Sequence, residues 1–386
     1  MSEPGAGAVP LRAIALHWTR IGMTGFGGPP THIALLRRLV VEQRRWIDQR
    51  EFEDGLAACN ILPGPASTQL AIFLARRIRG PVGALVGGLG FILPAVVMIV
   101  ALSAIFFGET PPTWVRGAGA GAGAAVAAVA VHAGASLARP SLDRATSRGR
   151  WLAYVVLGAA AGALVGRYVV LVLLGCGLLE LGAAGGLIDR TRAHAWMPFV
   201  LPATVAGAGG LGALAWVAFK VGALSYGGGF VIVPLMQGDA VHTYHWMTSA
   251  QFLDAVALGQ VTPGPVVATV AAVGYAAHRV EGAALAAAVA FAPSFVFVLL
   301  GGRQFDRVRA SDRAQAFLAG AGPAAIGAIL GAAIPLATAL REAWQFAVLG
   351  AAAIALLLAR RGVVATLVGA GLVGTVVALA GGPVPL

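Results

Sequence analysis

The hydrophobic positions of this chain form a series of long apolar runs, and charged residues gather in short segments between them. Residues 82–107, 114–137, 283–300 and 317–340 are almost purely apolar. A run of about 20 such residues is long enough to cross the hydrocarbon core of a bilayer as a helix. Because these runs recur along almost the whole length, the pattern predicts an all-α polytopic membrane protein without a sizeable soluble domain.

Several apolar runs are interrupted by residues that end helices. Pro-Gly-Pro occurs at 63–65 and again at 263–265. Proline removes a backbone donor and stops the helix before it, so these stretches are predicted to be broken or re-entrant helices. The runs from 151 to 187 and from 344 to the C-terminus are too long for one crossing. We expect helical hairpins there, with tips at Arg167-Tyr168 and Arg360-Arg361.

The chain repeats itself with an offset of 200 residues. Trp246 corresponds to Trp46, and the two Pro-Gly-Pro motifs fall in register without a gap. A membrane protein that repeats at half its length is typical of a transporter built from two related halves. We therefore predict an N-terminal repeat at 1–188, a linker at 189–210 and a C-terminal repeat at 211–386.

The basic residues indicate that the two repeats have inverted topology. Residues 37–51 carry five arginines and residues 237–251 carry none, whereas 303–313 carry four and 108–112 none. Basic residues concentrate in cytoplasmic loops, so equivalent loops are expected on opposite sides of the membrane. Inversion requires an odd number of crossings in each half. About five spans each result if the Pro-Gly-Pro elements are re-entrant.

Composition limits the classes of function. The 386 residues are 58% hydrophobic and 11% charged, with a net charge of +11 that fits basic cytoplasmic loops, an anionic substrate being the alternative. Two cysteines lie far apart, and no metal cluster, Ser-His-Asp set or nucleotide motif has an interpretable spacing. We expect no enzyme activity, cofactor, metal or nucleic-acid partner. An intramembrane enzyme and a sensor are the remote alternatives.

The Pro-Gly-Pro breaks are the best candidates for a binding site. The half-helix after each break begins with free N–H groups and the positive end of its dipole, which suit an anion. Two inverted breaks meeting near the midplane would frame one site, whereas the alternative is that the prolines only kink packed helices. The candidate residues are Asn60, Pro63, Gly64, Pro65, Gln260, Thr262, Pro263, Gly264 and Pro265, with Ser67, Thr68 and Gln69 beside them.

Other residues have a structural and a functional interpretation, and both stay open here. Four glycines would let the backbone approach a ligand or a neighbouring helix. They are Gly27, Gly28, Gly227 and Gly228. Arg20 and Lys220 would compensate an oxyanion or extend to the interface. Asp54 and Asp254 would be N-caps or groups for proton coupling or gating. For Glu180, which has no repeat mate, a packed or hydrogen-bonded role is favoured over a relay.

These motifs together resemble a known family. Gly25-Phe26-Gly27-Gly28-Pro29, Leu62-Pro63-Gly64-Pro65 and the second copy ending in Thr262-Pro263-Gly264-Pro265 are similar to the long, two-domain form of the chromate ion transporter family. The resemblance implies a multi-pass protein of the bacterial inner membrane that exports chromate and confers resistance, driven by the membrane potential or a coupled ion. Sulfate is the natural competitor, and a homodimer is left open as the assembly.

Overall fold

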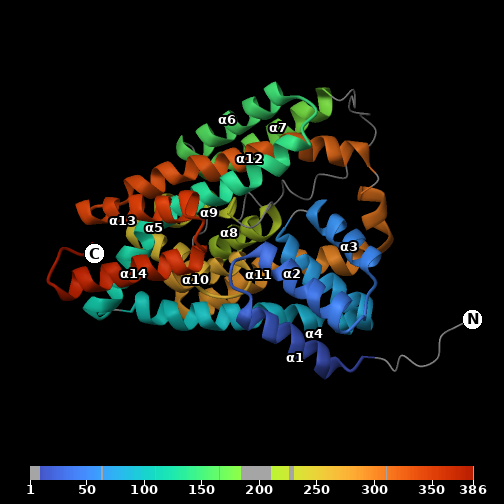
Figure 1. Cartoon of the computed structure of the whole chain (residues 1–386), viewed down its shortest axis with the longest axis horizontal. Coiled ribbons are helices and arrows are strands. Elements are labelled where there is room, and N and C mark those ends of the chain that lie inside the picture. The colour runs from blue at the N-terminus through green and yellow to red at the C-terminus, as the bar shows by residue number, and fades with distance from the viewer. Residues whose placement is uncertain are drawn as a thin grey trace, which may run out of the picture.

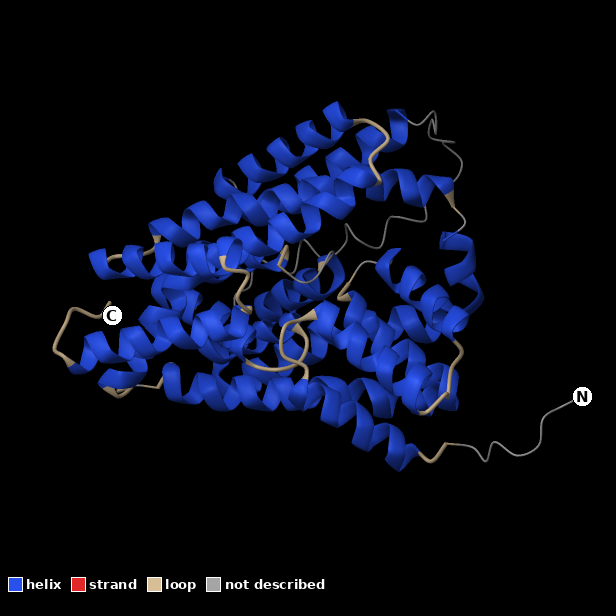
Figure 2. Cartoon of the chain, viewed as in Figure 1, coloured by secondary structure: helices blue, strands red, loops and turns tan. Residues whose placement is uncertain are grey.

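The fold is helical throughout the part of the chain that the structure describes. The computed structural model describes residues 9–61, 64–108, 110–164, 166–183, 210–225, 230–309 and 311–385. No strand occurs among them (Figure 2). In a bilayer a helix satisfies its own backbone hydrogen bonds, which an open strand cannot do. The prediction of an all-α membrane protein is confirmed.

The elements follow one another with short connections. Their order is α1 (Leu11–Thr24), α2 (Pro29–Arg37), η1 (Arg38–Gln43), α3 (Gln49–Ile61), α4 (Ala66–Phe106), α5 (Thr113–Asp143), α6 (Arg148–Leu164), η2 (Gly166–Tyr168), α7 (Val169–Ala183), α8 (Gly210–Leu224), α9 (Ile232–Gln237), η5 (Gly238–Thr243), α10 (Ser249–Val261), η6 (Val266–Ala268), α11 (Thr269–Arg309), α12 (Asp312–Thr338), α13 (Ala343–Ala353), η7 (Ile354–Leu358) and α14 (Val363–Leu379). The predicted helix breaks near Arg167-Tyr168 and Arg360-Arg361 are both present.

Four segments of the described residues are long and apolar enough to cross a membrane. They are Ala66–Phe106, Thr113–Asp143, Val266–Leu300 and Asp312–Thr338. On α4, large apolar side chains spaced three or four residues apart point outward and are 45% to 64% exposed; they are Val82, Leu85, Leu89, Leu93 and Val97. In water such a face would be a liability, which agrees with the expectation of a membrane protein.

Both long helices that follow the breaks fold back on themselves. In α4, Arg79 and Gly80 leave the helical conformation, and a Cβ on Gly83 would meet the carbonyl oxygen of Ala75. In α11, Gly274 and Gly282 meet in the same way across the turn at Arg279. Residues eight apart in a straight helix are separated by about 12 Å. Each long helix is therefore a short arm and a long arm packed side by side.

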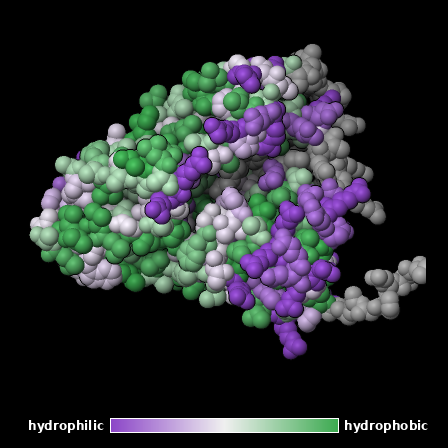
Figure 3. Space-filling view, viewed as in Figure 1, coloured by the Kyte–Doolittle hydropathy of each residue, from purple (hydrophilic) through white to green (hydrophobic). Residues whose placement is uncertain are grey.

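Helices α6, α7 and α12 lie side by side along one flank of the molecule, and α1 and α4 lie along the opposite flank (Figure 1). Glycines allow α6 and α12 to approach closely, because Gly158 and Gly162 face the backbone of Ala324 and Ala328. Such contacts between small residues drive helix association in lipid. Hydrophilic residues gather at the end that holds α2 and α3 (Figure 3).

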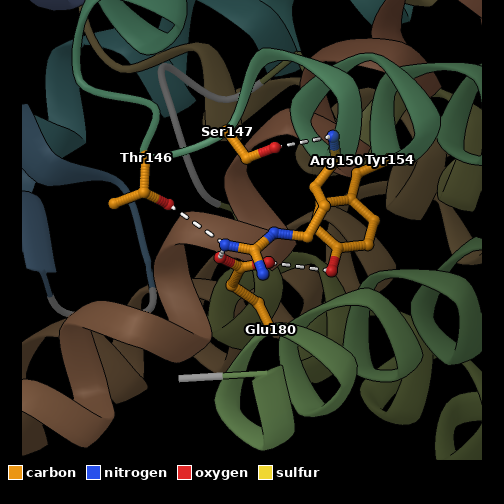
Figure 4. A network of polar contacts seen from close by, with 5 residues as sticks. All are labelled: Thr146, Ser147, Arg150, Tyr154 and Glu180. Atoms are coloured by element: carbon orange, nitrogen blue, oxygen red, sulfur yellow. Dashed lines mark hydrogen bonds and ion pairs between the residues drawn. The ribbon is translucent and has the colours of Figure 1, made fainter. Parts of the chain in front are cut away.

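A polar network joins α6 to α7. Glu180 accepts a hydrogen bond of 2.9 Å from the hydroxyl of Tyr154 and lies 3.1 Å from the guanidinium of Arg150 (Figure 4). Its side chain is only 7% exposed. A buried carboxylate that is paired and hydrogen-bonded is stable where an isolated one is not. The predicted hydrogen-bonded role of Glu180 is confirmed.

Candidate functional site

The first break separates α3 from α4. α3 ends at Ile61, Gly64 has a φ of 121°, and α4 begins at Ala66 after the N-cap Pro65. The N-cap supplies no side-chain hydrogen bond, and the first helical bond runs from the N–H of Gln69 to the carbonyl of Pro65. The N–H groups before Gln69 therefore have no helical partner. They form a cluster of backbone donors at the start of α4.

The second break has the same local form. α10 ends at Val261, Gly264 has a φ of 105°, and η6 begins at Val266 after Pro265. The N–H of Gly264 donates to the carbonyl of Gly25, at 3.1 Å. That carbonyl belongs to the loop between α1 and α2, so the second break is bonded directly to the first half of the chain.

Each break also lies against the first helix of the other half, which is α1 for the second break and α8 for the first. A Cβ on Gly264 would lie 3.4 Å from the carbonyl oxygen of Gly22, and a Cβ on Gly64 would lie 3.4 Å from that of Gly222. The Cβ on Gly264 would also come within 2.6 Å of Ala95. Gly22 and Gly222 occupy equivalent positions in the two sequence copies. Each Pro-Gly-Pro element thus contacts the first helix of the opposite half.

Buried polar atoms without a hydrogen-bond partner lie on or directly after helices that adjoin the two breaks. Thr68 Oγ1, Ser225 Oγ and Gln260 Nε2 are buried and make no hydrogen bond within the described residues. Thr68 is in the first turn of α4, Ser225 follows the end of α8, and Gln260 is in the last turn of α10. A buried polar atom usually has a partner, so each of these atoms is available to a water molecule or a polar ligand.

The other predicted site residues differ in their exposure and in their hydrogen-bond partners. Asn60 and Arg20 are exposed, and Lys220 is paired with Asp239 at 2.5 Å. The N–H and hydroxyl of Thr262 both donate to the carbonyl of Leu258. Gly27 and Gly28 have φ values of 104° and 73°, in the turn before α2, and Pro263 is buried. Pro63, Gly227 and Gly228 lie outside the described residues.

The N-cap interpretation of Asp54 and Asp254 is wrong. Asp54 lies inside α3 and is exposed, and Asp254 lies inside α10, whose N-cap is Thr248. The carboxylate of Asp254 rests on the backbone of α5, because a Cβ on Gly119 would lie 2.8 Å from its Oδ1. It also lines a cavity of about 410 Å³ together with Arg116, Gln251 and Gln345.

Comparison with known proteins identifies the family. A model of the chromate transporter family matches residues 12–181 and 212–375. The chain belongs to the chromate transporter family. It is 34% identical over 337 residues to the chromate transport protein of Cupriavidus metallidurans, covering 85% of this chain and 82% of that protein. It is 32% identical to the chromate transport protein of Pseudomonas aeruginosa, covering 84% and 80%. No solved structure matches the chain.

In this member of the chromate transporter family, sequence reasoning missed a buried histidine on α2. His32 is fully buried on α2, and its Nε2 lies 2.8 Å from the carbonyl of Gly25. Its Nδ1 lies 3.3 Å from the hydroxyl of Ser67, in the first turn of α4. The equivalent positions in the second half are Ile232 and Val267. A search for residues repeated in both halves therefore passes over this pair.

Proposed function

We propose that the chain exports chromate from the cytoplasm across the bacterial inner membrane, binding the oxyanion between its two halves at the Pro-Gly-Pro breaks. The observation that carries the site is the buried hydroxyl of Thr68, which has no partner among the described residues and lies in the turn that holds the free N–H groups of α4. A tetrahedral oxyanion accepts hydrogen bonds from every side. Membership of the chromate transporter family supports chromate as that oxyanion.

The repeated local structure supports two inverted repeats around this site. The π-helices η1 and η5 begin 200 residues apart, at Arg38 and Gly238, and Arg45 and His245 after them both have positive φ, at 51° and 53°. The reciprocal contacts of Gly64 with Gly222 and of Gly264 with Gly22 follow the same offset. In such folds the substrate binds where the repeats meet, and one repeat moves against the other.

The membrane potential favours export of a dianion. Moving one elementary charge through 100 mV changes its free energy by about 2.3 kcal/mol, or about 4.6 kcal/mol for two charges. A negative cytoplasm therefore favours the outward movement of chromate. The Asp254 cavity, next to the loop 108–112 that lacks basic residues, is our proposed external vestibule.

The experiment is uptake of chromate into inside-out membrane vesicles energised to be positive inside, with sulfate as competitor. We expect potential-dependent accumulation in the wild type, a loss of about tenfold in apparent affinity for Thr68→Val, and near-normal uptake for the matched control Thr68→Ser. Equal uptake in all three would remove Thr68 from the site. Accumulation of sulfate but not chromate would assign the transporter to sulfate, and movement of neither anion would contradict the proposal.

A further inference from the structure

The environment of His32 fixes which of its ring nitrogens carries the proton. The carbonyl oxygen of Gly25 can only accept, so Nε2, at 2.8 Å, is the protonated nitrogen. Nδ1 of the neutral ring is then an acceptor. Among the described residues, the polar group that lies beside it is the hydroxyl of Ser67, at 3.3 Å. The hydroxyl proton of Ser67 is therefore directed at the histidine.

This arrangement withholds a donor from the proposed anion site. Ser67 and Thr68 are neighbours in the first turn of α4, where the N–H groups are free. While Ser67 donates to Nδ1, its oxygen presents only lone pairs to an incoming oxyanion, which repel it. Thr68 lies in the same turn, fully buried, and its hydroxyl has no hydrogen-bond partner among the described residues.

Protonation of the ring reverses the bond. With a proton on Nδ1, the imidazolium donates to the oxygen of Ser67, and the serine hydroxyl proton is free to turn toward the anion. The ring also gains a positive charge, and only the Ser67 hydroxyl would separate it from the bound oxyanion. A cation and an anion that enter a dry site together compensate each other, whereas either alone is costly to bury.

We propose that oxyanion binding at the N-terminus of α4 takes up one proton at His32, through the hydrogen bond between His32 and Ser67. This inference rests on the proposed function and adds a proton to it as a second ligand. α1, α4 and the loop between α1 and α2 pack around the ring, and the groups that contact it are the Gly25 carbonyl, the Ser67 hydroxyl and the ring of Phe91, at 5.0 Å between centroids. Arg20 of α1 and Arg77 and Arg79 of α4 are exposed, and Arg76 bonds to the carbonyl of Val298.

The proposed proton uptake can be measured, because proton binding and anion binding are thermodynamically linked. If one proton binds with the anion, anion affinity rises by up to about tenfold for each unit that the pH falls. By reciprocity, anion binding draws a proton from the buffer. Calorimetric titration of the full chain in lipid nanodiscs with chromate, in two buffers that differ in ionisation enthalpy, measures the number of protons taken up. A pH near 8 keeps chromate itself a dianion, and sulfate serves as a second probe that does not titrate.

We expect proton uptake in the wild type, and in His32→Gln weaker anion binding without proton uptake or dependence on pH. Proton uptake and affinity should be normal in the matched control His132→Gln, a partly buried histidine of α5. Binding of chromate without proton uptake, or uptake that persists in His32→Gln, would overturn this inference and leave the proposed function standing. Failure of the wild type to bind either anion would instead refute the proposed function.

A second measurement covers a His32→Gln protein that does not fold. In wild-type protein labelled with ¹⁵N-histidine, one of the seven histidines should change on addition of sulfate from a bare to a protonated Nδ1. Ser67→Ala should shift the same signal in the anion-free protein, which assigns it to His32. If no histidine changes its protonation with sulfate bound, the inference is wrong.

Discussion

The ammonium of Lys220 lies 2.5 Å from a carboxylate oxygen of Asp239, and the two side chains are 16% and 6% exposed. Leu39 stands at the position equivalent to Asp239, so exposed Arg20 cannot form this pair in the first half. Arg20 and Lys220, which occupy equivalent positions in the two sequence copies, therefore have different surroundings. The charge of Lys220 is already compensated by a carboxylate of its own half, whereas Arg20 is exposed.

Asp239→Asn is expected to destabilise the protein by about 3–5 kcal/mol, because it leaves the ammonium of Lys220 buried without a counter-charge. Thermal unfolding can be followed with a thiol-reactive dye, since Cys59 and Cys176 are free and buried. The matched control is Glu42→Gln, which breaks the exposed pair with Arg37, at 3.9 Å. That change should cost less than about 1 kcal/mol. Equal melting temperatures for the two variants would contradict the role of the buried pair.

The sequence predicted those parts of the fold that depend on local signals. Proline and glycine end helices wherever they fall, so the breaks after Ile61 and Val261 and the hairpin tip at Arg167 could be read from the residues alone. The offset of 200 residues located equivalent positions without a structure. The sequence also showed that 237–251 lacks the arginines of 37–51, and in the structure Gly238 is buried where Arg38 is exposed.

The residues that sequence reasoning missed are defined by tertiary contacts. His32 meets Ser67 only because α2 packs on the start of α4, 35 residues along the chain. Asp239 meets Lys220 only because η5 returns to α8. Neither His32 nor Asp239 has a repeat mate of similar chemistry, since Ile232 and Leu39 are apolar. A comparison of the two halves favours what they share and gives no weight to what one half adds.

Glu180→Gln is expected to lower stability by about 1–3 kcal/mol and to leave chromate transport unchanged. The variant loses the charge that pairs with Arg150 and weakens the bond from Tyr154. Tyr154→Phe, which removes one hydroxyl, should cost about 1 kcal/mol and serves as the milder comparison. Melting temperature and vesicle uptake are measured on the same preparations. A loss of transport in Glu180→Gln at normal stability would point to the relay role that the sequence left open.

Gly264→Ala is expected to abolish most chromate transport. Its φ of 105° is unfavourable for alanine, and the added Cβ would lie 2.6 Å from that of Ala95. The shift needed to relieve this contact moves the N–H that donates to Gly25. Gly80→Ala is the matched control, because Gly80 also has positive φ, at 65°, but a Cβ there has nothing within 4 Å. It should cost about 1–3 kcal/mol in stability, because its ψ of −160° also favours glycine, and preserve uptake. Equal uptake by both variants would remove the second break from the transport site.

Gly119→Ala tests whether Asp254 has a role beyond packing. α10 lies along α5 much more extensively than its equivalent α3 lies along α12, and the carboxylate of Asp254 occupies the contact. A Cβ on Gly119 would come within 2.8 Å of that carboxylate, so α5 and α10 must separate. We expect lower stability and little transport.

The double variant Gly119→Ala with Asp254→Ala removes the clash and should recover the melting temperature. Transport should stay low if the carboxylate, which shares its cavity with Arg116, acts in gating. Gly369→Ala on α14 is the control, since a Cβ there meets nothing within 4 Å and helix propensity alone favours alanine by about 1 kcal/mol. Recovery of both stability and transport in the double variant would mean that Asp254 only packs against α5. Recovery of neither would mean that this contact does not hold α10 in place.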